Sequence, residues 1–218
     1  MSAPAPAPAP VAAPTSEAAP AGPRTFTIDA KKSALVVQVF KEGAAAAFAQ
    51  DHAMHATVMS GEIVADAGAP RAASVWVTVA TKGIVNDDPK VRTRFGLPLD
   101  IADGDRAAIG NTMRGPDVLD VEKFPAISFQ STSIDVVVAP DGRSAKGNVT
   151  GEFTLRGVTK PLTIPITVKL VDAEIEARGD VRFKGSDWGM APLSMFLGAV
   201  KNKDELLLHV RFVGTMTP

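Results

Sequence analysis

Apolar and polar residues alternate with a period of two through most of the chain beyond residue 24. In LTIPITVKL the apolar set is Leu162, Ile164, Ile166, Val168 and Leu170, and threonine, proline and lysine fill the positions between them. This alternation is typical of a strand with one buried face. The same pattern predicts strands at 147–155, 174–184 and 206–212, and less regular alternation adds 24–28, 33–40, 56–64, 74–82 and 126–138.

Eight or nine such strands predict an all-β structure with an apolar interior, in which one sheet closes on itself or two sheets stack. The apolar phase slips near Ser131, as at a β-bulge, and Pro165 on the polar side of its strand predicts an edge or a bulge. Gly151 and Gly179 fall on the inward phase, where the missing side chains favour a cavity. Outer-membrane barrels carry aromatic girdles, which a chain with no tyrosine and two tryptophans cannot form. We therefore expect a soluble, eight-stranded antiparallel barrel.

One helix is predicted among these strands, in DRAAIGNTMR (105–114). Asp103 or Asp105 is expected to cap its first turn, and Gly115-Pro116 is expected to end it. The helix falls in a long segment between two strands, so we expect it to lie against the barrel.

Composition excludes several classes of function. A formal net charge of -1 gives no electrostatic reason to expect nucleic acid as a partner. The absence of cysteine excludes disulfides, thiolate metal ligands and cysteine nucleophiles. No stretch approaches the roughly 20 apolar residues of a membrane-spanning helix.

Residues 1–23 differ from the rest, because proline alternates there with alanine. Such a tract predicts a semi-rigid linker without a core, followed by one domain over 24–218. The N-terminus lacks the basic start and the leucine-rich core of a secretory signal. The expected compartment is the cytoplasm if the chain begins here naturally, and a removed signal is the alternative.

Three segments together resemble the YceI-like family: LDVEKFPAISFQSTSI (119–134), GNVTGEFTLRGVTKPLTIPITVKL (147–170) and SDWGM (186–190). The resemblance covers residues 24–214. It implies a lipocalin-like barrel whose apolar tunnel holds a polyisoprenoid or a related amphiphilic lipid. It also implies a bacterial, periplasmic or secreted location, a transport function and no established catalytic residue.

The residues that carry the resemblance also have a structural interpretation. Phe124-Pro125 is expected to begin a strand, since proline is tolerated at a first strand position. RGVTKP (156–161) is expected to join two strands as a hairpin, with Gly157 at positive φ. We favour roles in the fold over contacts with a ligand for these motifs.

Large inward-facing apolar residues are the predicted contacts of an isoprenoid lipid or a quinone. By phase these are Val37, Val77, Phe129, Phe153, Ile164, Ile166 and Phe183. We expect a non-catalytic carrier with no metal and no other cofactor. The alternative is a filled barrel that acts as an interaction module. A homodimer is a further expectation for either function.

The segment DHAMH (51–55) contains two of the three histidines. On a helix His52 and His55 would share a face and could chelate a metal ion with Asp51, whereas on a strand they would face opposite ways. The alanine-rich sequence before them predicts a turn that runs into a strand near Ala56. We favour histidines that line the tunnel mouth. A metal-dependent enzyme using Asp51, His52 and His55 is the alternative, with His209 expected outside the barrel.

Lys90, Arg92 and Arg94 form a basic cluster in the segment that should lie over one end of the barrel. Arginine holds phosphate oxygens bidentately, so this cluster would suit a phosphate or quinone head group. The interpretation we favour is a solvated loop that is neutralised by its neighbours Asp87, Asp88 and Asp100.

Overall fold

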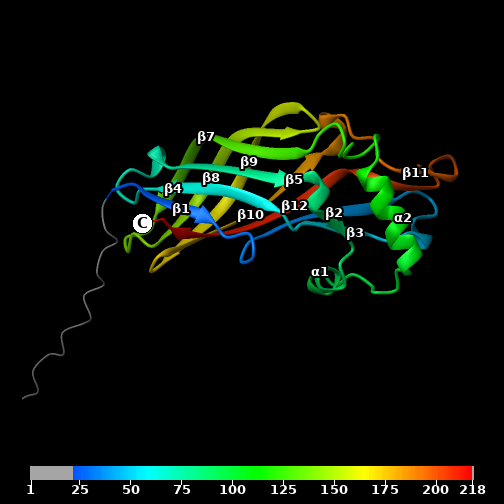
Figure 1. The fold of residues 1–218 in the computed structure, drawn as a ribbon, viewed down its shortest axis with the longest axis horizontal. Coiled ribbons are helices and arrows are strands. Elements are labelled where there is room, and N and C mark those ends of the chain that lie inside the picture. The colour runs from blue at the N-terminus through cyan, green and yellow to red at the C-terminus, as the bar shows by residue number, and fades with distance from the viewer. Residues whose placement is uncertain (1–21, 218) are drawn as a thin grey trace, which may run out of the picture.

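A computed structural model describes residues 22–217, so most of the predicted linker lies outside the described residues. Eight antiparallel strands close a barrel, because the last strand pairs with the first (Figure 1). In spatial order they are β1 (Arg24–Ile28), β4 (Met59–Ala65), β5 (Ser74–Ala80), β7 (Ala126–Val138), β8 (Ser144–Leu155), β9 (Val158–Val171), β10 (Glu174–Lys184) and β12 (Val200–Met216). The predicted fold class is confirmed.

Four further strands extend this sheet. β2 (Ala34–Glu42), β3 (His52–Ala56) and β6 (Ile84–Asn86) continue from β12 in that order, and β11 (Ser194–Met195) also pairs with β12. Short 3-10 helices join the strands: η1 (Ala46–Phe48), η2 (Pro70–Ala72), η3 (Thr81–Gly83), η4 (Gly185–Trp188) and η5 (Phe196–Gly198).

The strands at 24–28, 126–138 and 174–184 are confirmed to the residue, and the register shift between Ser131 and Ser133 confirms the bulge. The single strand expected at 56–64 is wrong. The chain instead forms β3 and β4, with Thr57 and Val58 between them. DHAMH therefore lies mostly in a strand, and the alanine-rich turn is limited to η1.

Helix α2 (Asp103–Arg114) ends at Gly115 as expected, but the predicted cap is wrong. Ala102 is the N-cap residue and makes no side-chain cap hydrogen bond. Asp103 and Asp105 lie inside the first turn, where their negative charge interacts favourably with the positive end of the helix dipole. Neither α2 nor the shorter α1, among residues 22–217, is long and apolar enough to cross a membrane.

Helix α1 (Pro89–Arg94) was not predicted. The Asp88 carboxylate caps it by accepting hydrogen bonds from the amides of Lys90 (2.8 Å) and Val91 (3.3 Å). Aspartate followed by proline at the first helical position is a known start signal, and it was present in the sequence. α1 lies beside the barrel, against β3, rather than over its end (Figure 1).

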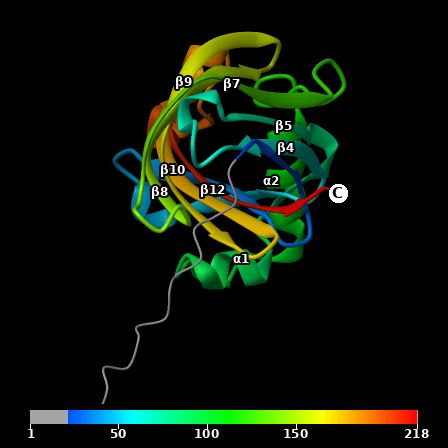
Figure 2. The ribbon, with the colours of Figure 1, turned by 90° about the vertical axis from the view of Figure 1, so that its left-hand side faces the viewer.

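One end of the barrel is closed by α2 and the segment that follows it. Met113, Leu119 and Val121 belong to the same buried cluster as the inward side chains of the strands. Figure 2 looks into the barrel from the opposite end, with α2 behind the ring of strands. Within residues 22–217, the β4–β5 and β7–β8 connections border the interior at the end away from α2.

The family-like motifs build this closed end. Arg156 and Gly157 both have positive φ (51° and 72°) in the turn between β8 and β9, and the Phe124 ring packs against Gly157. The Arg156 guanidinium donates a hydrogen bond to the Val118 carbonyl (2.5 Å). The indole N–H of Trp188 donates to the Phe153 carbonyl (3.1 Å). These contacts agree with the structural interpretation of the motifs.

The expectation that Gly151 and Gly179 enlarge the cavity is wrong, because neighbouring groups occupy the space. A Cβ at Gly151 would lie 2.5 Å from both the Gln130 carbonyl oxygen and the Phe129 ring. A Cβ at Gly179 would lie 2.5 Å from the Pro165 carbonyl oxygen. The β9–β10 pairing runs from Ile166 to Val171 and stops short of Pro165, so the proline stands where β9 becomes an edge on that side.

Replacing Gly151 with alanine is expected to lower the free energy of unfolding by about 1–3 kcal/mol, because the added methyl group overpacks the wall. Chemical denaturation of the purified variant measures this change. Gly104→Ala is the matched control, since no atom lies within 4 Å of its Cβ position and alanine favours the helix. A rise of about 0.5 kcal/mol is expected there, and a loss equal to that of Gly151→Ala would contradict the packing account.

Candidate functional site

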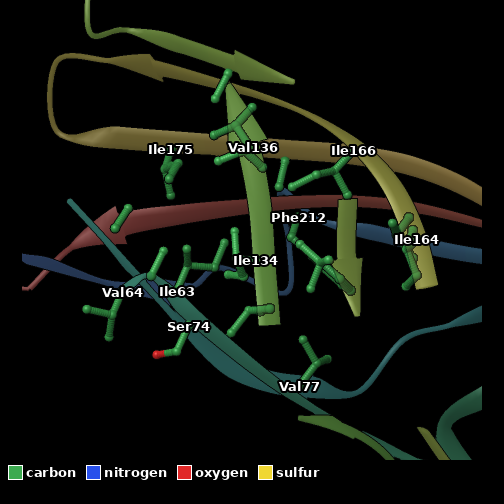
Figure 3. A pocket seen from close by; sticks show the side chains of 18 of the residues that line it. Ile63, Val64, Ser74, Val77, Ile134, Val136, Ile164, Ile166, Ile175 and Phe212 are labelled. Atoms are coloured by element: carbon green, nitrogen blue, oxygen red, sulfur yellow. The ribbon is translucent and has the colours of Figure 1, made fainter. Parts of the chain in front are cut away.

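A cavity of about 170 Å³ lies inside the barrel, and its lining is mostly apolar. Most of the side chains come from β4, β5, β7, β8, β9, β10 and β12, with one residue each from β1 and β2, and they converge on one space (Figure 3). Lining residues from the β4–β5 and β7–β8 connections mark the open end, which we call the mouth. The cavity thus follows directly from the inward phase of the alternating strands.

The lining includes five of the seven predicted apolar contacts. They are Val77, Phe129, Phe153, Ile164 and Ile166. Val37 and Phe183 do not line the cavity. Phase shows which face of a strand is inward, but not how far along the barrel axis a residue lies. The part these residues take in holding a ligand stays a prediction.

Three aromatic rings form the floor of the cavity. Phe153, Phe183 and Trp188 pack edge to face, with centroid separations of 5.6 Å, 5.3 Å and 5.4 Å. Only the first of these rings reaches the lining, because Phe183 and Trp188 lie behind it. Trp188 is 3% exposed, and all three rings belong to the buried cluster that also contains Met113 and Leu119 of the closed end.

Charged residues occur in the lining at the mouth: Arg24, Asp66 and Arg143. The Asp66 carboxylate accepts a hydrogen bond from the Gly68 amide (2.8 Å) and so caps a turn. Sequence analysis named none of the three, although Arg24 shares the inward phase of Phe26 and Ile28 in its strand. That phase was the available signal.

His52 and His55 lie away from the cavity, so the expectation that they line its mouth is wrong. On β3 they face opposite sides, and His55 stands opposite Val36 on the outer face of the sheet. The Asp51 carboxylate accepts a hydrogen bond from the Lys41 amide (2.8 Å). Within residues 22–217, no group of three potential ligands is placed to hold a metal ion.

His209 does lie on the outer face, as predicted, but it is not free there. It is hydrogen-bonded to Asp180 (2.6 Å) and Gln38 (2.9 Å), and its ring packs against Phe95 at a centroid distance of 4.8 Å. The segment around α1 therefore covers the outside of β2, β3 and β12 and forms a small second core. Val36 and Ala53 are buried beneath it.

The expectation that Arg92 lies in a solvated loop is wrong, since Arg92 is 0% exposed. Its guanidinium donates to the Asp87 carboxylate (2.7 Å), to the Gln50 side chain (2.9 Å) and to the carbonyls of Asp51 and Pro98 (2.9 Å and 2.6 Å). Neutralisation by Asp87 is as expected, but these contacts leave the group unsuited to a head group. Arg94 and Lys90 are exposed on α1, away from the cavity.

The pKa of Asp87 lies below its ordinary value although burial opposes the charged form. Hydrogen bonds and charge from His52, together with the Ala53 amide and Arg92, outweigh the burial. The carboxylate therefore stabilises the fold above its ordinary pKa of 3.8, and this stability is lost as the pH falls through the lowered pKa.

Measuring the free energy of unfolding as a function of pH tests whether the pKa of Asp87 is lowered. The free energy of unfolding of the wild type is expected to fall with decreasing pH below about 4, and Asp87→Asn is expected to show a shallower fall. The slopes of the free energy of unfolding against pH should differ by an amount that approaches the uptake of one proton on unfolding. Equal slopes for the two proteins would contradict the lowered pKa of Asp87.

Comparison with known proteins agrees with this architecture. A family profile described as the YceI-like domain matches residues 26–213. A UPF0312 protein of Pseudomonas aeruginosa is 38% identical over 106 residues, which cover 45% of this chain and 50% of that protein. A UPF0312 protein of Yersinia pestis is 35% identical over 109 residues, covering 46% and 51%. The chain spans about half the length of these curated relatives.

Two solved structures share the fold at low sequence identity. BcnA of Burkholderia cenocepacia superposes with a TM-score of 0.60 at 18% identity, over 86% of this chain and 99% of that one. A structure described as a polyisoprenoid binding domain from Saccharophagus degradans gives a TM-score of 0.58 at 12% identity, over 88% and 98%. With the family profile matching nearly all of the barrel, this chain belongs to the YceI-like family.

Proposed function

We propose that this protein binds the tail of a polyisoprenoid-type lipid in the barrel cavity, and that it carries or stores this lipid without changing it chemically. The observation that carries the proposal is the apolar cavity inside the barrel, which opens at the mouth. Methyl-branched side chains such as Val77, Ile164 and Ile166 present to the cavity the same kind of surface as a methyl-branched isoprenoid chain.

Burial supplies the binding free energy in this proposal. Each methylene group removed from water contributes about 0.8 kcal/mol. The lining offers few polar groups below the mouth, so the tail is recognised by shape and apolarity. The same tail chemistry is found in polyprenols and in the side chains of quinones, and both are candidate ligands.

The size of the cavity predicts a dependence on chain length. At about 170 Å³ it resembles the engineered apolar cavities of roughly 150 Å³ that hold benzene. A chain of several isoprene units must therefore separate side chains of the lining or extend through the mouth. We expect affinity to rise with each added isoprene unit and then to level off, because units outside the barrel remain in water.

The fold comparison supports the proposal from a separate direction. The Saccharophagus degradans structure that shares this barrel is described as a polyisoprenoid binding domain. A common fold does not establish a common ligand. The cavity in this chain supplies the chemical reason to carry the ligand class over.

Tryptophan fluorescence tests the proposal. Trp188 contacts Phe153 at the cavity floor, whereas Trp76 is 37% exposed on the outside and contributes background. The variant Trp76→Phe, freed of bound lipid, would be titrated with polyprenols of increasing length. A saturable change in Trp188 fluorescence with affinity that rises with length is expected. No change for any length would overturn the proposal and favour a filled barrel that acts as an interaction module.

A further inference from the structure

Two apolar loops lie side by side at the end of the barrel away from the mouth (Figure 1). The first loop, 43–50, follows β2 and contains η1, and the second, 189–200, contains β11 and η5 and leads into β12. The Ala45 amide in the first loop donates a hydrogen bond to the Ala199 carbonyl in the second (2.8 Å). We call this pair of loops the apolar tip.

Neither loop of the apolar tip carries a charged residue. Residues 43–50 read GAAAAFAQ, and residues 189–200 read GMAPLSMFLGAV. Charged residues make up 22% of the whole chain, so two uncharged loops that touch each other stand apart from the rest of it. Runs of apolar residues in exposed loops are unfavourable in water unless they serve a contact with something else.

The apolar tip exposes large side chains to the surroundings. Phe48 is 92% exposed and Leu197 is fully exposed, and no other large apolar side chain in the described part of the chain is as exposed. Leu193 is 40% exposed in the same loop as Leu197. None of the three belongs to the buried cluster of the barrel, so the fold gains little from them.

The backbone of Leu197 is a second sign of function at the tip. Its φ of 56° and ψ of 33° lie in the left-handed region, where glycine or asparagine is usual because a larger side chain is strained. A fully exposed leucine makes no packing contact that would offset this strain. Strained residues of this kind cluster at functional sites, so Leu197 points to a contact that its side chain makes outside the chain.

The form of the tip favours a bilayer over a second copy of the chain. Even a large aromatic side chain buries only about 150–250 Å². The three exposed side chains therefore offer less than the roughly 800 Å² per partner that a stable dimer needs. A bilayer requires no complementary shape, because an apolar side chain gains free energy by entering the boundary between head groups and acyl chains. The uncharged loops bring no charge into that layer.

The charges around the tip are mixed. Lys41 precedes the first loop, and Lys201 and Lys203 follow the second. Lysine can extend its charged end to head groups while its apolar stem lies against an apolar layer. Glu42 pairs with Lys201 (2.9 Å), however, and Asp204 follows Lys203. Binding should therefore depend on apolar insertion and little on anionic lipid.

We propose that the apolar tip inserts Phe48, Leu193 and Leu197 into the surface layer of a lipid bilayer, so that the protein docks on a membrane by the end opposite the mouth. This inference does not depend on the proposed function, because none of the three side chains lines the cavity. Docking by the tip leaves the mouth directed away from the bilayer.

Cosedimentation with phosphatidylcholine vesicles tests the proposal on the full chain after removal of bound lipid. The wild type is expected to bind the vesicles and to stay bound at high salt, because apolar insertion is not screened by ions. Phe48→Ser and Leu197→Asn should each weaken vesicle binding by about tenfold. Asparagine tolerates the left-handed backbone, so Leu197→Asn should be at least as stable as the wild type to thermal unfolding.

Val137→Ser is the matched control, because Val137 is 79% exposed on β7 and lies outside both loops. It should leave vesicle binding unchanged. Failure of the wild type to bind phosphatidylcholine vesicles, or equal binding by the wild type and both tip variants, would overturn the proposal. Binding that requires anionic lipid and is lost at high salt would overturn apolar insertion. A dimer in analytical ultracentrifugation that both tip variants dissociate, without vesicle binding, would assign the tip to a second copy instead.

Discussion

Phenylalanine in place of Ala177 is expected to weaken lipid uptake by about a hundredfold, which corresponds to about 2.7 kcal/mol. Ala177 lines the cavity from β10, between its neighbours Val168 on β9 and Phe212 on β12. A phenyl ring at this position would take up space that the proposed tail occupies. Because the ring enters existing space, the barrel should stay folded, with a thermal midpoint close to that of the wild type.

The matched control adds the same ring to the outside of the barrel. Thr167 is exposed and faces outward on β9, opposite Arg178. Thr167→Phe should bind polyprenol with wild-type affinity in the same fluorescence titration. If Ala177→Phe remained folded and also kept wild-type affinity, the cavity would not be the binding site.

Leucine in place of Arg92 is expected to lower the free energy of unfolding by about 3–5 kcal/mol, enough to unfold much of the protein at moderate denaturant concentration. The change leaves the Asp87 carboxylate buried without its cation, and both residues are 0% exposed. It also leaves the Gln50 side chain without its donor. Urea denaturation followed by circular dichroism measures the loss.

Two further variants separate the buried ion pair from general damage to α1. Arg94→Leu removes an exposed cation from the same helix and should change stability by less than about 0.5 kcal/mol. Asp87→Asn should lower the free energy of unfolding less in the Arg92→Leu variant than in the wild type. In the Arg92→Leu variant, it removes a carboxylate that has already lost its cation. Additive losses from Arg92→Leu and Asp87→Asn would show that the two side chains do not act as a pair.

Most of the barrel could be predicted from the sequence, because the alternation of apolar and polar residues within each wall strand shows which face is buried. The alternation in 174–184 specifies which face is inward without reference to any other strand. The break between β3 and β4 was harder to predict from the sequence, because Thr57 and Val58 are neither glycine nor proline. Its position depends on pairing with β2 and β6, which are distant in sequence.

Prediction of the site was limited by contacts between distant segments. Nothing local distinguishes Arg92 from the exposed Arg94, and only the packing of α1 on β3 buries one of them. The depth of Phe183 depends on Trp188 and the floor of the cavity. Arg24 was not predicted, because a single cation on the inward phase of a strand forms no cluster in the sequence.

The most direct test of the account is native mass spectrometry of the freshly purified protein, with solvent extraction of any bound molecule. The account predicts an added mass of several hundred daltons that extracts as an isoprenoid chain and is lost in Ala177→Phe. A bare protein mass, with no added mass after incubation with polyprenols or quinones, would contradict it.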